Sequence, residues 1–226
     1  MTRGECLERI AQRIAELDRP HTVRVAIDGV DAAGKTTLAD ELAPDVEALG
    51  RPVIRAGIDG FHHPKRVRYR RGPDSAEGYY EDSFALDGLI AALLRPLGPD
   101  GSRVYRTALF DHRIDAPVDA PRYRAMPRAI LLFDGVFLLR PELRPFWDYS
   151  IFVRARFDVT LARAKHRDAA LLGSADEVER RYKARYIPGQ QIYLDRCRPE
   201  SRADLVIDND DAAHPIIVAR PFGCSR

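Results

Sequence analysis

The stretch Val23-Arg-Val-Ala-Ile-Asp-Gly-Val-Asp-Ala-Ala-Gly-Lys-Thr36 decides the fold of this chain. Its first six residues are mostly apolar, which predicts a buried strand. The next eight, from Gly29 to Thr36, fit the pattern G-x-x-x-x-G-K-[ST]. A helix from about Lys35 to Leu49 and a second short strand from Pro52 to Ala56 are predicted to follow. Strand, glycine turn, helix and strand in this order begin an α/β sheet.

The glycine turn has the chemistry of a phosphate-binding loop. Gly29 and Gly34 let the backbone curl so that successive N–H groups point at phosphate oxygens, and the helix that follows adds the positive end of its dipole. Lys35 can reach the β- and γ-phosphates, and the Thr36 hydroxyl can ligate Mg²⁺. We therefore predict a site for ATP, or another nucleoside triphosphate, with Mg²⁺. The predicted nucleotide-binding residues of the loop are Gly29, Asp31, Ala32, Ala33, Gly34, Lys35, Thr36 and Thr37.

The composition is that of an ordinary globular protein. The chain has 226 residues, of which 45% are hydrophobic and 31% charged, enough for one substantial domain. Its 36 Lys and Arg against 34 Asp and Glu give a net charge of +2, without the basic excess of nucleic-acid-binding proteins. With no repeat or linker, we expect a single domain over residues 1–226 and no nucleic-acid partner.

Nothing in the sequence predicts a membrane or secretory segment. The first 18 residues carry charges throughout and lack the apolar run of a signal peptide, and no apolar stretch approaches the ~20 residues of a membrane span. Cys6, Cys197 and Cys224 are an odd number of cysteines without metal-ligand spacing, which fits a reducing compartment. We expect a cytoplasmic protein with no membrane partner; whether it forms a homo-oligomer stays open.

The remaining predicted elements extend the α/β pattern. An amphipathic N-terminal helix is predicted because Leu7, Ile10, Ile14 and Leu17 recur at helical spacing. Glycine and proline make residues 60–78 and 111–127 irregular, and a loop as long as 60–78 is often functional. The other predicted elements are helices at 84–95, 157–168 and 174–186, and strands at 103–107, 129–133, 149–154, 205–208 and 216–218.

Three segments resemble a known group of proteins. The glycine turn, together with Ile58-Asp-Gly-Phe-His-His-Pro64 after the second strand, resembles the uridine kinase, pantothenate kinase and phosphoribulokinase group of small-molecule kinases, and within it the uridine kinase-like proteins. Thr160-Leu-Ala-Arg-Ala-Lys-His-Arg-Asp168 is similar to the start of that group's lid. The likeness spans roughly residues 23–210. It implies a P-loop NTPase fold of three layers, with a mostly parallel central sheet, a helical lid at about 163–186 and a substrate loop at about 59–83.

The resemblance also implies a reaction, in which the γ-phosphoryl group of ATP moves to a hydroxyl of a small acceptor. Asp59 would orient that hydroxyl and accept its proton, and its place after a strand beside the phosphate loop is where ligands collect in open α/β sheets. Arg163 and Arg167 would contact the triphosphate and stabilise developing charge. The alternatives are a turn-capping Asp59 and a solvated helix face on which Arg167 pairs with Asp168.

Asp134 is the second predicted ligand of Mg²⁺, beside Thr36. It ends the most apolar predicted strand and precedes Gly135, and a carboxylate there can hold the ion directly or through water. The resembled kinases more often carry Glu-Gly at this place, so this side chain is one methylene shorter. The alternative is a strand-end aspartate that bonds a neighbouring turn.

The acceptor pocket is predicted from aromatic and polar side chains, although Tyr and Phe are more often core residues. Its candidates are Phe61, His62, Tyr79, Tyr80, Tyr105 and Arg113. A nucleoside such as uridine or cytidine is the first expectation. Where uridine kinases carry Asp-His-Pro, this chain has Tyr79-Tyr-Glu-Asp-Ser83, so pantothenate, a sugar, or a regulatory NTPase without an acceptor remain alternatives. The basic segment Lys65-Arg-Val-Arg-Tyr-Arg-Arg71 is expected to be a solvated loop, with phosphate or carboxylate recognition as the alternative.

Overall fold

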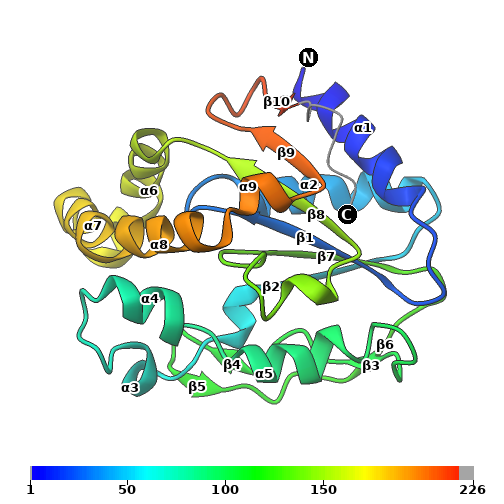
Figure 1. Cartoon of the computed structure of the whole chain (residues 1–226), viewed down its shortest axis with the longest axis horizontal. Helices are drawn as coiled ribbons and strands as arrows, with labels where there is room; N and C mark the ends of the chain where they lie inside the picture. The colour runs from blue at the N-terminus through cyan, green and yellow to red at the C-terminus, as the bar shows by residue number, and fades with distance from the viewer. Residues whose placement is uncertain (1, 219–226) are drawn as a thin grey trace.

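A central sheet of six strands organises the protein (Figure 1). The structure is a computed structural model that describes residues 2–218. The strand order is β10–β9–β8–β1–β7–β2, and neighbouring strands are parallel except for β10, which is antiparallel to β9. The strands of this sheet are β1 (Val23–Gly29), β2 (Val53–Gly57), β7 (Ile130–Gly135), β8 (Tyr149–Arg154), β9 (Leu205–Asp208) and β10 (Ile216–Val218).

Helices surround the sheet and two small ribbons lie at its lower edge in Figure 1. The α-helices are α1 (Arg3–Ala15), α2 (Lys35–Ala48), α3 (Lys65–Arg68), α4 (Ala76–Asp82), α5 (Leu86–Leu89), α6 (Phe157–Leu172), α7 (Ala175–Arg181), α8 (Ile187–Cys197) and α9 (Pro199–Arg202). The 3₁₀ turns are η1 (Ile58–Phe61) and η3 (Arg144–Phe146), and the π-helical turns are η2 (Ile90–Leu94) and η4 (Tyr182–Tyr186). The ribbons pair β3 (Val104–Tyr105) with β6 (Tyr123–Arg124) and β4 (Phe110–Asp111) with β5 (Ala116–Pro117).

The two faces of the sheet bury two separate hydrophobic clusters. On one face, Ile10 of α1 and Leu42 of α2 pack with Val25 of β1 in a fully buried cluster. On the other face, η2 and α8 cover the sheet, and Tyr193 packs in one cluster with Phe133 of β7. Helices on both sides of a mostly parallel sheet are the three-layer α/β arrangement predicted from the sequence. That prediction is confirmed.

The helices α6 and α7 form a smaller cluster beside the sheet, where the lid was predicted. Ala164, Val178 and Tyr182 are its buried members. Helix α6 ends at Gly173, whose φ of 98° suits glycine, and the Ser174 side chain accepts a hydrogen bond of 3.1 Å from the N–H of Glu177. Ser174 therefore caps α7, the first part of the helix predicted at 174–186.

Several predicted elements differ from the structure. The segment 60–78 contains η1, α3 and the start of α4, and the predicted helix at 84–95 is π-helical from Ile90 to Leu94. The predicted strand 103–107 shrinks to two residues, and β5 and β6 lie within the segment 111–127. Helix α8 was not predicted, since the predicted helix at 174–186 ends where it begins; Pro188 lies in the first turn of α8, where proline needs no backbone donor.

The expectations for Cys224, for the end of the domain and for membrane segments can be compared with the structure only over residues 2–218. Cys224, and residues 219–226 of the predicted domain, lie outside them. From residue 2 to residue 218, no helix combines the length and apolar character needed to cross a membrane.

The order of the strands brings three chain segments to one edge of the sheet. Strand β7 lies between β1 and β2, with Asp134 beside Ile27 on one side and beside Gly57 on the other. Residues that follow parallel strands gather at the carboxyl edge of the sheet. The glycine turn after β1, Asp59 after β2 and Asp134 at the end of β7 therefore meet there.

Candidate active site

In the phosphate loop, residues 29–36, the backbone at the two glycine positions of the motif has a conformation that suits glycine alone. Gly29 has φ of 154°, and a Cβ there would lie 2.4 Å from the carbonyl oxygen of Val153. Gly34 has φ of 97°, and a Cβ there would lie 2.6 Å from Nδ2 of Asn209. Both positions combine positive φ with close approach of a neighbour, so the pattern of the motif follows from the geometry.

The loop ends in a helix N-terminus that no side chain caps. Gly34 is the N-cap of α2, and its first turn receives no side-chain hydrogen bond at the cap. The first N–H groups of such a helix lack partners within the helix and attract an anion. Three loop amides are already bonded, because Gly29 donates to Asp28 (2.8 Å), Asp31 to Oε1 of Gln190 (2.6 Å) and Ala33 to the carbonyl of Val30 (3.2 Å). We therefore assign the remaining anion-binding donors to the Gly34 end of the loop.

Lys35 is buried at the base of the loop. Its Nζ donates to the carbonyl oxygen of Val30 at 2.6 Å. Burial lowers the pKa of Lys35, and nearby carboxylates, with Asp31 foremost, oppose this shift. The ammonium group is held by one backbone oxygen and faced by acidic side chains, as a group that binds phosphate oxygens needs to be.

Thr36 and Asp134 are in direct contact, although they come from different elements. The Thr36 hydroxyl donates to Oδ2 of Asp134 at 2.5 Å, and Arg55 of β2 donates to Oδ1 of the same carboxylate at 3.0 Å. Two hard oxygen ligands side by side fit Mg²⁺, which usually completes its shell with waters and substrate phosphates. Residues 2–218 contain no cluster of three or more His, Cys, Asp or Glu arranged to hold a metal ion. A cation here would thus depend on these two residues and on the nucleotide.

Asp59 lies in η1, directly after β2, and its side chain is 74% exposed in a large cleft. Nε2 of His62 is 3.2 Å from one of its carboxylate oxygens. Partial desolvation raises the pKa of Asp59, but the hydrogen bond and charge of His62, with the charges of His112 and Lys35, outweigh it and hold the pKa below its usual value. The side chain is an accessible carboxylate that can accept a hydrogen bond.

One cleft contains most of the predicted site. It extends from the phosphate loop past Asp59 to α3, with α6, α7 and η4 on its other side. The predicted residues that line it are Asp31, Ala32, Lys35, Thr36, Asp59, His62, Tyr79, Arg113, Asp134 and Arg167. Charge partners across it include Lys35 with Asp59 and Asp31 with Arg167.

A second hollow adjoins the cleft at Lys35 and Thr36, and contains Gly34, Thr37 and Arg163. Arg163 donates through Nη2 to the backbone carbonyls of Asn209 (2.8 Å) and Asp210 (3.0 Å). Its Nη1 is buried without a hydrogen-bond partner among the described residues. The structure places Arg163 in this hollow, beside Gly34 and Thr36 of the phosphate loop, and not in the cleft of Asp59, so its contact with the triphosphate stays a prediction.

Arg167 lines both the hollow and the cleft. Its guanidinium group donates to Asp168 at 2.6 Å, so the ion pair that the sequence left as an alternative is present. The hydrogen bond to Asp168 raises the pKa of Arg167 further above its usual range. Of the two predicted arginines, Arg167 is the one that lies where the nucleotide and acceptor regions meet.

Three predicted acceptor-binding residues are core residues in the structure. Phe61 has no exposed surface and packs against Phe133, with ring centroids 6.2 Å apart. The Tyr80 hydroxyl lies 3.3 Å from Sγ of Cys197, and Tyr80 does not line the cleft. Tyr105 lies in β3, in a different hollow from the cleft. These predictions were wrong because aromatic rings gain more by filling the core than by meeting a ligand.

Tyr79 contacts the phosphate loop as well as the core. Its hydroxyl donates to Oδ2 of Asp31 at 2.6 Å, and its ring packs edge-on against Phe137 and Tyr186. Burial raises the pKa of Tyr79 well above its usual value, and so does the charge of Asp31. Burial also raises the pKa of Asp31.

Sequence reasoning missed the residues of α8 that hold the loop. The Gln190 side chain accepts from the N–H of Asp31 at 2.6 Å and donates to its carboxylate at 3.1 Å. Three residues further along, the Tyr193 hydroxyl donates to Asp28, and Asp28 also accepts from the N–H of Gly29 at 2.8 Å. Burial raises the pKa of Asp28 to about 6. The three-residue spacing of Gln190 and Tyr193 is a helix-face signal that could have found them.

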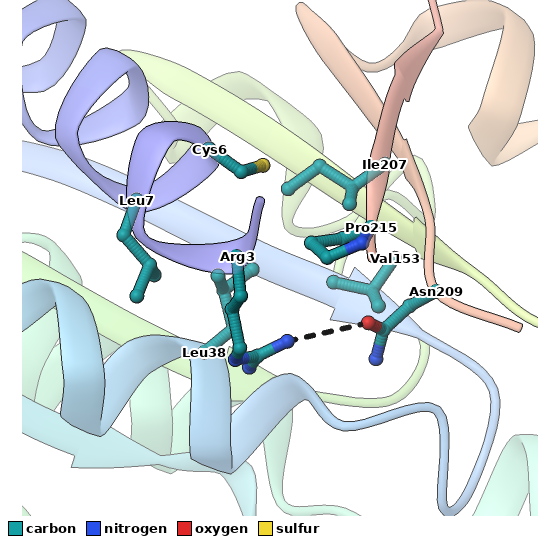
Figure 2. A pocket seen from close by; sticks show the side chains of 8 residues that line it. All are labelled: Arg3, Cys6, Leu7, Leu38, Val153, Ile207, Asn209 and Pro215. Atoms are coloured by element: carbon teal, nitrogen blue, oxygen red, sulfur yellow. Dashed lines mark hydrogen bonds between the residues drawn. The ribbon is translucent and has the colours of Figure 1, made fainter. Parts of the chain in front are cut away.

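Asn209, directly after β9, supports the loop from the opposite side. Its Nδ2 donates to the carbonyl of Ala33 at 2.7 Å. Figure 2 shows Arg3 of α1 directed at Asn209, with 3.5 Å between Nη1 and Oδ1. The shape of the loop is therefore fixed by residues from both ends of the chain.

Comparisons with known proteins agree with this architecture. No family model matches the chain, and no curated protein matches its sequence. Among solved structures, a candidate uridine kinase from Bacillus stearothermophilus has a TM-score of 0.72 at 22% identity and covers 90% of this chain and 97% of its own. A candidate fructose transport system kinase from Silicibacter sp. TM1040 has a TM-score of 0.73 at 25% identity, with 88% and 98% covered.

A third solved structure, D-glycerate 3-kinase from Cryptococcus neoformans, has a TM-score of 0.54 at 12% identity, and the match covers 84% of this chain and 86% of that chain. All three share the α/β arrangement over most of their length. The chain therefore has the α/β fold of these P-loop kinases, in agreement with the resemblance of its three sequence segments.

Proposed function

We propose that this protein is an ATP-dependent kinase that transfers the γ-phosphoryl group to a hydroxyl of a small molecule. The observation that carries the proposal is that Asp59 lines the same cleft as Lys35 and Thr36 of the phosphate loop. An acceptor in that cleft can therefore reach both a proton acceptor and the bound phosphates. The three structural neighbours are all described as kinases, which supports the assignment of this protein to the kinases.

The reaction follows from the placement of these groups. The triphosphate lies against the N-terminus of α2, with Lys35 on its β- and γ-phosphate oxygens. Asp59 accepts a hydrogen bond from the acceptor hydroxyl and takes its proton as the oxygen attacks the γ-phosphorus. One O–P bond forms, the bond to the bridging oxygen breaks, and ADP leaves. Mg²⁺ held by Thr36 and Asp134 would neutralise charge on the β- and γ-phosphates.

The two arginines of α6 have separate roles in this proposal. Arg167 lines the cleft and the hollow, so it is the candidate for stabilising charge on the transferred group. Arg163 lines the hollow alone, and we assign it to the nucleotide. The buried, unpartnered Nη1 of Arg163 supports a polar ligand there.

The class of acceptor is a finer question. The names of the neighbours differ, in that they mention uridine, fructose transport and glycerate. A nucleoside was the first expectation because aromatic side chains could stack on a base. Phe61, Tyr80 and Tyr105 do not line the cleft, although Tyr69, Phe84 and other aromatic side chains do, so the predicted stacking residues do not decide between a nucleoside, a sugar and a hydroxy acid.

An activity assay tests the proposal. The protein is incubated with Mg-ATP and a panel of nucleosides, sugars and hydroxy acids, and both ADP and phosphorylated products are measured. We expect at least one acceptor to be phosphorylated. Hydrolysis of ATP at the same rate without any phosphorylated acceptor would instead identify a regulatory NTPase, the alternative left by the sequence.

A further inference from the structure

The cleft is lined by charged side chains of both signs. Near the phosphate loop and the lid helices, the acidic side chains Asp31, Asp59, Asp134 and Asp168 lie in the same cleft as the basic side chains Lys35 and Arg167. Helix α3 and the turn after β4 contribute further basic side chains, namely Lys65, Arg68 and Arg113.

Arg68 is the basic residue with unused hydrogen-bonding capacity. Its side chain is 9% exposed, and Nη2 donates to Oδ1 of Asp115 at 3.2 Å. Its Nε is buried and has no hydrogen-bond partner within the described part of the chain. A buried donor without an acceptor costs free energy, so an unpartnered group of this kind points to a missing ligand.

Lys65, one helical turn before Arg68, adds a second positive charge, and its strongest acidic neighbour is the Asp115 that already pairs with Arg68. Its side chain is exposed at the cleft, and no ion pair of its ammonium group is found within residues 2–218. Its backbone N–H donates to the same Asp115 that pairs with Arg68, at 2.8 Å. Two cations thus share one aspartate, and the pair keeps an excess positive charge.

The other arginines of the cleft are already engaged. Arg113 donates to both carboxylate oxygens of Asp111. Arg185 donates to four backbone carbonyls, Arg181 to Glu177, and Arg167 to Asp168. Among the described arginines that line the cleft, Arg68 is the one with a buried donor that lacks a partner, and Lys65 lies beside it.

Two histidines connect Asp59 with Arg68. Nε2 of His62 is 3.2 Å from Asp59, and the rings of His62 and His112 lie 4.7 Å apart. Burial lowers the pKa of His112, and the positive charges of His62 and Arg68 lower it further, so Arg68 lies within electrostatic reach of His112.

We propose, on the basis of the function proposed above, that the acceptor is an anion whose carboxylate or phosphate is bound by Arg68 and Lys65 while its hydroxyl meets Asp59. Hydroxy acids and phosphorylated polyols have this chemistry. Neutral nucleosides and free sugars do not. Arginine and lysine are the side chains that bind carboxylate and phosphate groups most strongly.

Matched pairs of acceptors test the charge requirement. The assay uses Mg-ATP with D-glycerate and glycerol, pantothenate and pantothenol, and ribose 5-phosphate and ribose, with uridine as a further neutral compound. Phosphorylated products are quantified by mass spectrometry. We expect product from an anionic member and not from its neutral partner, and the pair that responds distinguishes carboxylate from phosphate.

Three variants locate the binding site of the anion. Arg68→Gln is expected to raise KM for the anionic acceptor about 10- to 100-fold, the worth of a hydrogen bond between charged groups, and to leave KM for ATP unchanged. Lys65→Gln, at an exposed side chain, is expected to raise the same KM without affecting folding. Arg66→Gln removes an equal charge from the same short helix but outside the cleft, and is expected to behave as the wild type.

The outcomes separate this inference from the proposed function. Transfer to neutral acceptors as fast as to anionic ones, or equal effects of Lys65→Gln and Arg66→Gln, would overturn the anion site and leave the kinase assignment standing. Turnover of ATP with no phosphorylated product from any acceptor would overturn the kinase assignment itself.

Discussion

The hydroxyl of Thr36, in the first turn of α2, donates a hydrogen bond of 2.5 Å to Asp134 at the carboxyl end of β7. The two residues are far apart in sequence and belong to different layers. Their contact places two oxygen ligands at the edge of the phosphate loop. Arg55 holds the other carboxylate oxygen of Asp134, so this aspartate is fixed before any cation arrives.

Replacement of Asp134 is expected to weaken the dependence of activity on Mg²⁺. Asp134→Ala removes one oxygen ligand, so the Mg²⁺ concentration for half-maximal activity should rise about 10- to 100-fold, as is typical when support for a bound metal is lost. Thr36→Ala should act in the same direction. Thr36→Ser keeps the hydroxyl and is the matched control. Unchanged titrations with Mg²⁺ in both alanine variants would remove this pair from the metal site.

Lys35→Ala is expected to abolish most of the transfer while the protein stays folded. The ammonium group contacts one backbone oxygen and faces the cleft, so turnover should fall by about 100-fold or more because charge stabilisation of the transferred group is lost. Turnover is followed by release of ADP, and folding by circular dichroism. A variant that unfolds at room temperature would show that Lys35 is mainly structural.

Asp59→Asn is expected to slow the chemical step without changing nucleotide affinity. The amide keeps the size of the side chain but cannot accept the proton, and the loss of a general base costs about 100- to 10,000-fold in rate. The measurements are kcat for the phosphorylated acceptor and Kd for ATP by titration calorimetry. If kcat stays at the wild-type value, Asp59 has no part in the proton transfer.

The contacts of α8 with the phosphate loop are expected to affect the affinity for ATP. Gln190→Ala removes the hydrogen bonds to Asp31, so KM for ATP should rise about 3- to 10-fold, the worth of about one hydrogen bond, with a smaller change in kcat. Gln191→Ala is the control, because the Gln191 side chain bonds Asp195 of its own helix and, within residues 2–218, no atom of the phosphate loop. Equal KM values in the two variants would mean that α8 does not position the loop.

Asp28 is expected to make stability depend on pH with an unusual sign. Burial raises its pKa from 3.8 to about 6, so between these values the folded state binds more protons than the unfolded state and stability falls as pH rises. Asp28→Asn removes this dependence. From about pH 4 to pH 7 the variant should gain about 2–3 kcal/mol of unfolding free energy relative to the wild type.

Urea unfolding of both proteins across this range provides the measurement. At any single pH, the difference in unfolding free energy between the two proteins also reflects hydrogen bonds to Tyr193 and Gly29, which asparagine and aspartate form differently. The change of that offset with pH reports the titration alone. Parallel curves would show that Asp28 is ionised in the folded protein throughout.

Local patterns predicted most of the sheet and the whole phosphate loop. The apolar runs before Gly29 and before Gly135 became β1 and β7, because a strand buried on both faces leaves a continuous hydrophobic signature. The glycine pattern predicted the loop because positive φ and close packing leave no other residue there. The ends of β2 and β7 indicated Asp59 and Asp134, and the glycine pattern indicated Lys35 and Thr36. The strand order brings these four residues together.

Other parts of the site depend on tertiary packing, which the sequence pattern does not contain. Tyr79 and Tyr80 are adjacent, yet only Tyr79 lines the cleft, since successive residues of α4 point in different directions. The spacing of Arg163 and Arg167 placed both on one side of α6 but could not say which hollow each one enters. The predicted helix ended at residue 186, so α8 was missed, together with the contacts that Gln190 and Tyr193 make from it.

Because Asn209 supports the phosphate loop, the loop cannot be held in its final shape as soon as its own residues have been synthesised. The glycine turn leaves the ribosome long before the amide that holds the carbonyl of Ala33, because the two bonded residues are 176 positions apart in the sequence. A growing polypeptide that ends before β9 carries every residue of the motif but lacks this clamp. The loop is thus held in its final shape only after β9 and Asn209 have been synthesised.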